Sequence, residues 1–153
     1  MAVKRSKLVR TRTSPQLDLA FAALRKFADK PEPAPVGPPG IMPEGSADRK
    51  QIPITTGVLD YFPAALIAVA QVSKVGNDQH NPGEPLHDAR GKSNDDADCM
   101  VRHLLQRGTI DIDGQPHSAK TAWRALRILQ KELEAAGAPL ARGARLPEGT
   151  ENL

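Results

Sequence analysis

Histidine and carboxylate side chains, which ligate metals and transfer protons, are concentrated in one part of this sequence. All four histidines, the single cysteine and the single tryptophan lie between His80 and Trp123, a stretch of 44 residues. The same stretch holds seven carboxylates, at Glu84, Asp88, Asp95, Asp96, Asp98, Asp111 and Asp113. Packing alone gives no reason to place these residue types together, so we interpret residues 80–123 as the functional region.

A helix predicted over residues 95–107 would carry several of these groups. Asp96, Cys99 and His103 are spaced i, i+3 and i+7, so they line one flank of that helix. A carboxylate and an imidazole two turns apart could hold a cation, with further ligands from other elements. Beside this flank runs an apolar stripe that we expect to be buried, made of Ala97, Met100, Val101, Leu104 and Leu105.

These acidic residues also have a purely structural interpretation. Asp95 and Asp96 would suit the positive end of the helix dipole, and Asp98 could form a salt bridge with Arg102 one turn later. For Cys99, a small buried or half-buried thiol is expected rather than a nucleophile.

A second helix with polar chemistry is predicted to begin at His117. Its apolar stripe is Ala119, Ala122, Trp123, Leu126, Leu129 and Leu133. Its other face carries His117, Lys120, Thr121, Arg124, Arg127 and Lys131. A row of ammonium and guanidinium groups would suit a polyphosphate, because Arg binds two phosphate oxygens at once and Lys supplies a point charge. An ordinary basic surface facing solvent is the alternative, above all for Arg127 and Lys131.

The elements that must position these groups are mostly helices, and the predicted fold is all-α. We expect a small domain of three to four helices: an amphipathic helix over 15–29, then helices from about Tyr61 to 75, over 95–107 and from His117 to about Ala136. The histidine-, glycine- and proline-rich stretch 76–94 is predicted to be an irregular loop in front of a helix capped by Ser93 or Asn94. A short hairpin could form over 109–115.

Composition shifts divide the chain into five segments. They are a basic arm (1–13), an amphipathic helix (14–30), a linker rich in proline and glycine (31–47), a helical domain (48–136) and a flexible tail (137–153). A domain with this small number of helices buries only a small core. We therefore expect the chain to associate with a second copy.

Charge and hydropathy narrow the classes of partner. The net charge of +3 comes mainly from residues 1–12, which carry five basic side chains and no acid. This arm could contact nucleic acid, although a solvated chain end is the simpler interpretation. No apolar run approaches the roughly 18 residues of a membrane span, and one cysteine cannot form an internal disulfide. We therefore expect a cytoplasmic protein that does not enter membranes.

Four sequence blocks together resemble a known family. They are LDYFPAAL (59–66), GNDQHNPG (76–83), ARGKSNDDADCMVRHLL (89–105) and DGQPHSAKTAWRALRILQKELE (113–134). They resemble the dATP/dGTP diphosphohydrolase N-terminal-like domain found widely in bacteriophages and prophages, over about half of the chain. The resemblance implies a mostly helical protein that hydrolyses purine deoxynucleoside triphosphates to monophosphate and pyrophosphate. The all-α, magnesium-dependent nucleotide pyrophosphohydrolases carry paired acidic motifs on neighbouring helices, whereas here a single DxxD, Asp95 with Asp98, is present.

If that activity holds, each residue type has an expected role. A divalent metal, Mg²⁺ or Mn²⁺ and alternatively Zn²⁺ or Fe²⁺, would bridge the phosphates. The predicted metal ligands are His80, Asp95, Asp96, Asp98, His103 and Asp113, with Asp111 as the alternative to Asp113. The predicted catalytic residues are His103, His117 and Asp96, where a histidine would hold or deprotonate the attacking water. The predicted substrate-binding residues are Asn81, Lys92, Arg102, Lys120 and Arg124.

Two other functions remain open at the level of the sequence. The chain could be a non-catalytic phage accessory protein that binds metal, nucleotide or a protein partner through residues 80–123. It could also bind nucleic acid through the basic arm.

Overall fold

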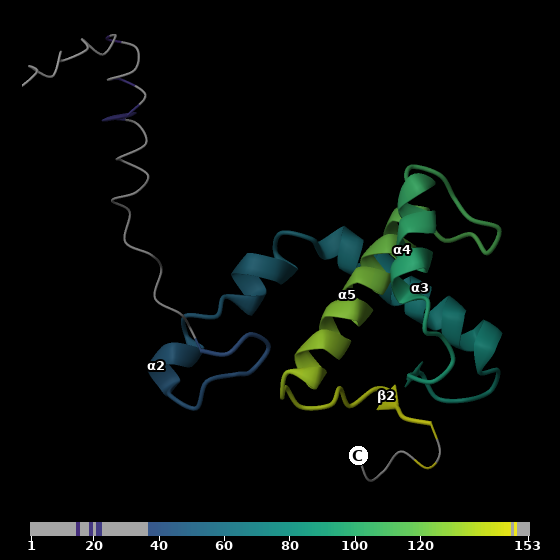
Figure 1. Cartoon of the computed structure of the whole chain (residues 1–153). Coiled ribbons are helices and arrows are strands. Elements are labelled where there is room, and N and C mark those ends of the chain that lie inside the picture. The colour runs from purple at the N-terminus through teal and green to yellow at the C-terminus, as the bar shows by residue number, and fades with distance from the viewer. Residues whose placement is uncertain (1–14, 16–18, 20, 23–36, 148, 150–153) are drawn as a thin grey trace, which may run out of the picture. The chain divides into compact units, whose positions relative to one another are not determined.

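The computed structural model describes residues 15, 19, 21, 22, 37–147 and 149 (Figure 1). Two compact units are distinguished, Met1–Pro35 and Val36–Leu153, and the second contains every element discussed below. Residues 15, 19, 21 and 22 are helical. The rest of the helix predicted over 15–29, and the basic arm 1–13, lie outside the described residues.

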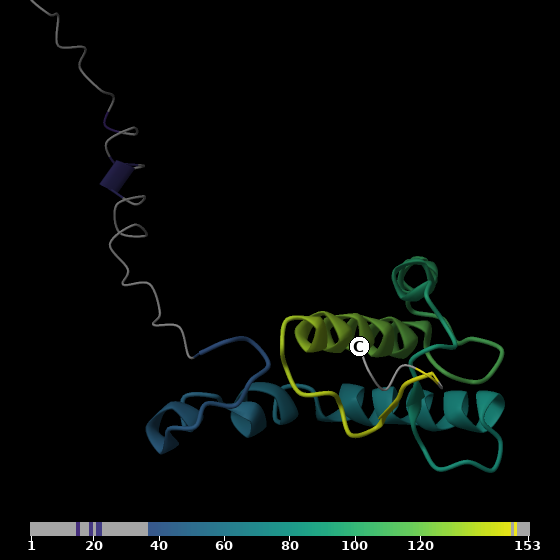
Figure 2. The same cartoon turned by 60° about the horizontal axis from the view of Figure 1, so that its bottom comes forward.

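The second unit is mostly helical. Its helices are α2 (Ser46–Arg49), the π-helix η1 (Thr55–Leu59), α3 (Pro63–His80), α4 (Asp96–Leu105) and α5 (His117–Ala135). Two-residue strands β1 (Asp88–Ala89) and β2 (Ala144–Arg145) pair in parallel. Figures 1 and 2 show α5 between α3 and α4, and α5 contacts both. No helix in the described part of the chain is long and apolar enough to cross a membrane.

The helix limits follow local sequence signals. Pro63 stands at the first position of α3, where a missing N–H costs nothing because that group has no partner within the helix. Asp95, rather than Ser93 or Asn94, is the residue before α4, and Gly108 with φ +84° follows its end. The predicted helix from His117 is confirmed, because α5 begins at that residue.

The loop predicted over 76–94 begins later than expected, because α3 continues to His80. Asn77 is buried near the end of α3, and its side-chain oxygen accepts hydrogen bonds from Asn81 Nδ2 and from the backbone N–H of His87. Its Nδ2 donates to the carbonyl oxygen of Glu84 at 3.1 Å. These hydrogen bonds stabilise the last turn of α3. The glycine and proline content of the segment, on which the predicted loop rested, does not indicate them.

Three other expectations about segments are corrected. The tail predicted over 137–153 is not loose at Ala144–Arg145, which pairs with β1. Part of the predicted linker 31–47 belongs to the compact unit, since a Cβ built on Gly40 would lie 2.8 Å from Leu133 of α5. The hairpin predicted over 109–115 is reduced to one antiparallel bridge between Ile110 and Pro116.

The packing between α4 and α5 is polar rather than apolar. Asp96 and Arg127 are each only 6% exposed, and their side chains form an ion pair. Arg124 and Lys131 contact the same carboxylate at 2.7 and 3.2 Å. Arg127 also donates from Nε to Asp88 of β1 at 2.9 Å, so one guanidinium joins α4, α5 and the loop before α4. The expectation that Arg127 belongs to a solvent-facing surface was therefore wrong.

The apolar stripe expected to be buried on the 95–107 helix is largely exposed, with Met100 half-buried. Val101, Leu104 and Leu105 of α4 are 47%, 44% and 75% exposed. The physical reason is that three cations of α5 hold Asp96 against that helix. Val101, Leu104 and Leu105 lie on other sides of α4 from Asp96, so they cannot face α5 at the same time. Among the described residues Ala119 is the single buried apolar side chain, so hydrophobic burial within this unit is slight.

A matched pair of substitutions tests the ionic packing. Asp96→Asn leaves Arg127 buried without a full charge partner, and we expect it to lower the free energy of unfolding by about 3 kcal/mol. Asp95→Asn removes an exposed carboxylate whose partner is Arg102, and we expect no measurable change. Urea denaturation followed by circular dichroism measures both. Equal effects of the two variants would contradict the assignment of Asp96 as the centre of the packing.

The same carboxylate predicts an acid-dependent effect. Burial alone would raise the pKa of Asp96, but hydrogen bonds from Arg127, Arg124 and Lys131 outweigh it and hold the pKa below 3.8. The stabilisation is therefore present above about pH 3.8 and is lost as the pH falls through the lower, folded-state value. We expect the difference in unfolding free energy between the wild type and Asp96→Asn to shrink below pH 4. A difference that stays constant from pH 7 to pH 2.5 would contradict this linkage.

Candidate metal centre

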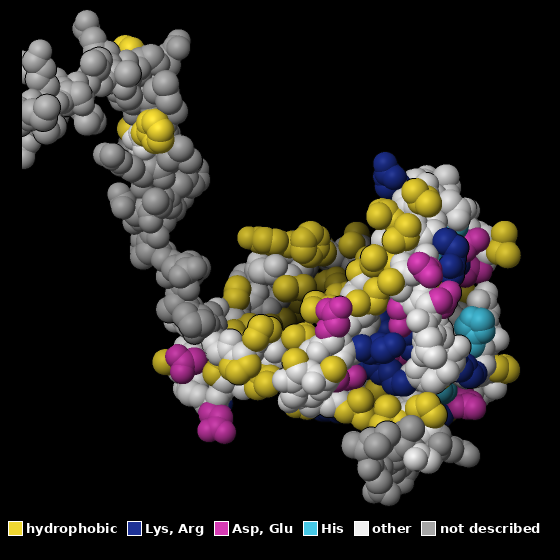
Figure 3. Space-filling model, viewed as in Figure 1, with side chains coloured by type: hydrophobic (Ala, Val, Ile, Leu, Met, Phe, Trp, Pro, Cys, Tyr) yellow, Lys and Arg dark blue, Asp and Glu magenta, His cyan; other side chains and the backbone are white. Residues whose placement is uncertain are grey.

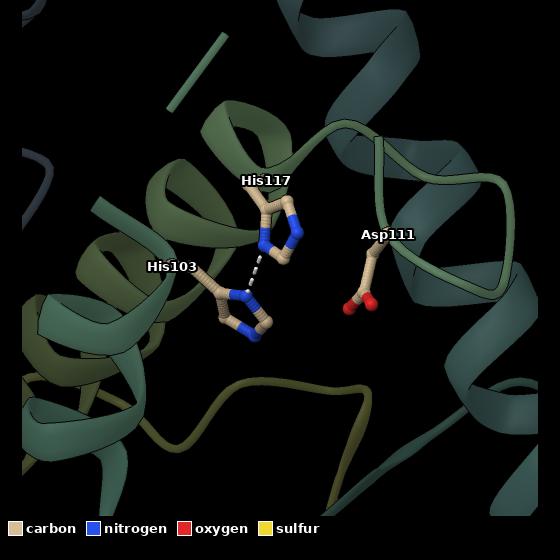
Figure 4. Close-up of side chains that lie close together, drawn as sticks. All are labelled: His103, Asp111 and His117. Carbon is tan, nitrogen blue, oxygen red and sulfur yellow. Dashed lines mark hydrogen bonds between the residues drawn. The ribbon is translucent and has the colours of Figure 1, made fainter. Parts of the chain in front are cut away.

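Three potential metal ligands converge where α4 ends and α5 begins (Figure 4). His103 Nδ1 lies 2.9 Å from His117 Nδ1, and one ligand atom each of His103, Asp111 and His117 lie within 4.8 Å of one another. His117 is 4% exposed, and the other two side chains are half-buried. In the described part of the chain no other three histidine, cysteine or carboxylate side chains come as close.

The connector between the helices brings the carboxylate to the imidazoles. The turn at residues 111–114 closes with a hydrogen bond from Gly114 N–H to the Asp111 carbonyl oxygen at 2.9 Å. Gly114 has φ +79°, a conformation that side chains other than those of Gly, Asn and Asp rarely adopt. The His117 N–H donates to the Thr109 carbonyl oxygen at 3.1 Å, which fixes the start of α5 beside the turn.

The protonation states suit metal binding. Burial, followed by the positive charge of Lys120, lowers the pKa of His103, so its imidazole is neutral at pH 7. The hydrogen bond from Lys120 lowers the pKa of Asp111, which is therefore a carboxylate. Imidazole nitrogen and carboxylate oxygen are ligand types that zinc accepts.

The spacing of the nitrogens also suits a metal. In the hydrogen bond between the rings one Nδ1 donates a proton and the other accepts it. Zinc–nitrogen bonds of about 2.0–2.1 Å at a tetrahedral angle place ligand nitrogens roughly 3.3 Å apart. The two rings would have to separate by only a few tenths of an ångström when a metal replaces the shared proton. Three protein ligands would leave a fourth position for water, as in catalytic zinc sites.

Lys120 holds the carboxylates of the connector. Its Nζ lies 2.6 Å from an oxygen of Asp111 and 2.6 Å from an oxygen of Asp113. Burial alone would lower the pKa of Lys120, but these two hydrogen bonds outweigh it and raise the pKa. Lys120 therefore fixes the position of a ligand without being one, which is a role that residues around metal sites commonly have.

The structure separates the six predicted metal ligands. His103 belongs to the converging group, whereas His80 is exposed at the end of α3 and Asp113 is paired with Lys120. Asp98 is exposed. Asp95 forms an ion pair with Arg102 at 2.7 Å, and this hydrogen bond lowers the pKa of Asp95 to about 2. The salt bridge expected between Asp98 and Arg102 is not formed, because Arg102 is used by Asp95.

Of the three predicted catalytic residues, two lie together and one lies apart. His103 and His117 are in contact, as described above. Asp96 is in the ion-pair network with Arg124, Arg127 and Lys131, outside the converging group. Asp111 took the place that the sequence analysis gave to Asp113, and only the geometry of the turn distinguishes the two.

All five predicted substrate-binding residues line one cavity of about 1110 Å³, together with His103 and Asp111. They are Asn81, Lys92, Arg102, Lys120 and Arg124. Each of them already has a polar partner. Lys92 donates to Asn81 Oδ1 and, at 2.6 Å, to the carbonyl oxygen of His80. Arg124 is held by Asp96, and the exposed Arg102 by Asp95.

Trp123 and Arg90 also line the cavity, although they were not among the predicted site residues. Trp123 was expected in the core or at an interface, and its Nε1 donates to Ser73 Oγ of α3 at 2.7 Å. Arg90 pairs with Glu134 at 2.9 Å and with Asp88 at 3.1 Å, and its Nε has no hydrogen-bond partner among the described residues. No short-range spacing pattern marks these residues, because their partners are distant in the sequence.

Comparisons of the chain with protein-family models, with curated proteins and with solved structures found no match.

Histidine substitutions test the metal centre directly. We expect the wild-type chain to bind Zn²⁺, and we expect His103→Gln and His117→Gln each to weaken binding at least tenfold, since each removes one ligand. His80→Gln is the matched control, because His80 lies outside the group. Isothermal titration calorimetry with Zn²⁺ and with Mn²⁺ measures the affinities. The same loss in the His80 variant, or none in the other two, would contradict the assignment.

Proposed function

We propose that this chain is a metal-dependent hydrolase that converts purine deoxynucleoside triphosphates to monophosphate and pyrophosphate. The observation that supports the proposal most is the convergence of His103, Asp111 and His117 beside the cavity. Two imidazoles and one carboxylate with room for a water ligand make a familiar hydrolytic metal set. Bound there, a divalent metal would make a water ligand more acidic and would offset charge on a phosphate group.

The ligand set favours a particular class of metal. Magnesium prefers oxygen ligands, whereas imidazole nitrogen suits zinc and iron ions better, and a mixed set of nitrogen and oxygen ligands leaves Mn²⁺ open. Three of the carboxylates that the sequence analysis assigned to the metal are held by cations, Asp95 by Arg102, Asp96 by Arg127 and Asp113 by Lys120. We therefore propose Zn²⁺, Mn²⁺ or Fe²⁺ at the protein site, with any Mg²⁺ arriving on the substrate.

The cavity has the size and chemistry for a nucleotide. Its volume of about 1110 Å³ is at the upper end for small-molecule sites, which run to about 1,000 Å³. Apolar groups from α3 and α5, including Val69, Val72 and Trp123, line it and offer a surface for a base. Lys120 and Arg124 line the same cavity as the metal group and supply donors for phosphate oxygens.

We assign the proton transfer to Asp113. His103 and His117 would both be metal ligands, so neither nitrogen that faces the metal is available as a base. Asp113 shares Lys120 with the ligand Asp111, and its carboxylate is mostly buried. Burial alone would raise the pKa of Asp113, but the hydrogen bond from Lys120 outweighs it and lowers the pKa, so Asp113 would be a charged carboxylate able to take up a proton from the attacking water.

One observation favours a second function, a metal-binding protein without catalysis. Three of the cations that line the cavity are balanced by carboxylates: Lys120 by two, and Arg124 and Arg102 by one each. A triphosphate must displace these carboxylates or bring its own cations. Nucleic-acid binding through residues 1–13, the third interpretation, concerns residues outside the described part of the chain.

A product assay tests the proposed hydrolysis. Purified full-length protein is incubated with each of the four deoxynucleoside triphosphates in Mn²⁺, Zn²⁺ or Mg²⁺, and the products are separated by ion-exchange chromatography. We expect monophosphate and pyrophosphate from dATP and dGTP. His103→Gln should lower the rate at least a hundredfold, because it removes a ligand, whereas His80→Gln should keep it.

The possible results separate the two functions. Turnover that requires His103 and His117 supports the hydrolase. Metal binding without turnover of any nucleotide under any metal would overturn the hydrolase and leave the metal-binding protein. Turnover that survives His103→Gln would place the chemistry elsewhere.

A further inference from the structure

The outward face of α4 is apolar and has no partner within the described residues. Val101, Leu104 and Leu105 are 47%, 44% and 75% exposed, and Figure 3 shows hydrophobic side chains along this helix. Ala97, Val101 and Leu104 of α4 follow one another at spacings of four and three residues. That is the periodicity of a helix seam that packs against another helix.

The charges beside this seam are unpaired and opposite in sign at its two ends. Asp98, in the first turn of α4, is exposed and has no ion-pair or hydrogen-bond partner among the described residues. Arg107, just beyond the end of α4, is also exposed, and among the described residues its guanidinium has one hydrogen bond, to the carbonyl oxygen of Leu104 at 3.4 Å, and no carboxylate partner. The other charged residues of α4 all have partners, which makes these two distinctive.

The geometry points to a second copy of this chain as the partner of the seam. Two α4 helices packed antiparallel about a two-fold axis place the acidic start of each beside the basic end of the other. With the axis between residues 102 and 103, Asp98 of one copy faces Arg107 of the other, and Val101 faces Leu104. The same axis sets Ala97 of one copy against the turn after α4 of the other, where Gly108 lies, and both residues are small. A seam that is complementary to itself in both charge and size is what a symmetric dimer requires.

The area of the seam sets the expected strength of the dimer. The exposed side chains of α4 offer on the order of 500 Å² per copy, or about 1,000 Å² in total, which is near the lower limit for specific interfaces. Burial of this face would also give the unit the hydrophobic contact that it lacks, since Ala119 is its only buried apolar residue among those described. We therefore expect a dimer with a micromolar dissociation constant.

A charge-reversal cycle on the full-length chain tests this dimer. Asp98→Arg sets two arginines against each other at both ends of the seam, and Arg107→Asp sets two aspartates. Sedimentation-velocity ultracentrifugation over a protein series from 1 to 300 µM (roughly two decades around the expected constant) measures association. Each single variant should weaken the dimer at least tenfold. The double variant Asp98→Arg, Arg107→Asp should restore it to within about threefold of the wild type.

Two further variants keep the result specific to α4. Val101→Glu places a charge in the seam and should give a monomer, whereas Ile67→Glu changes an apolar residue of α3 that is 62% exposed and should leave the dimer intact. Circular dichroism checks that helix content is unchanged. A wild type that is monomeric throughout the series, as it would be if a different protein covers α4, overturns the proposal. A dimer whose dissociation constant is unchanged by the α4 substitutions would also overturn the proposal. So would a double variant whose dimer is no stronger than that of the single variants.

Discussion

The buried ion pair between Asp96 and Arg127 is the interaction on which the rest of the unit depends. It joins α4 to α5, and through Asp88 it also holds the loop that precedes α4. A buried pair is costly to desolvate, and apolar side chains of the same volume often stabilise a fold as well or better. The pair instead restricts the geometry of the fold. A guanidinium that contacts two carboxylates permits few arrangements of the elements that it joins.

This constraint decides which face of α4 points inward. With Asp96 buried, His103 lies two turns along the same flank and comes to rest against His117. The apolar residues Val101, Leu104 and Leu105 are turned outward as a consequence. One orientation of α4 therefore places His103 beside His117 on one side of the helix and exposes the proposed seam on the other. A change that rotated α4 would disturb both together.

Much of the helical content could be predicted from the sequence, whereas the functional role of residues 80–123 stays a prediction. Helix starts such as His117 follow local rules, because capping and proline effects act over a few residues. The orientation of α4 could not be predicted, since apolar periodicity normally marks the buried face and Asp96 overrides it only through Arg127, 31 residues away. The sequence analysis named Asp113 with Asp111 as its alternative, and it could not decide between them for a similar reason. Both flank the same turn, and only its backbone shows which carboxylate faces the histidines.

A unit with so little apolar burial must obtain stability from other sources. Metal binding and self-association would each involve only the folded chain. Each would therefore stabilise the folded state and shift the folding equilibrium toward it by mass action. Both act on α4, one through His103 on its inner flank and the other through Val101 and Leu104 on its outer flank. A metal that fixes the end of α4 would already have ordered that helix, so less conformational entropy would be lost when two copies pair through the seam. Linkage then requires the reverse effect, in which a dimer binds the metal more tightly than a monomer does.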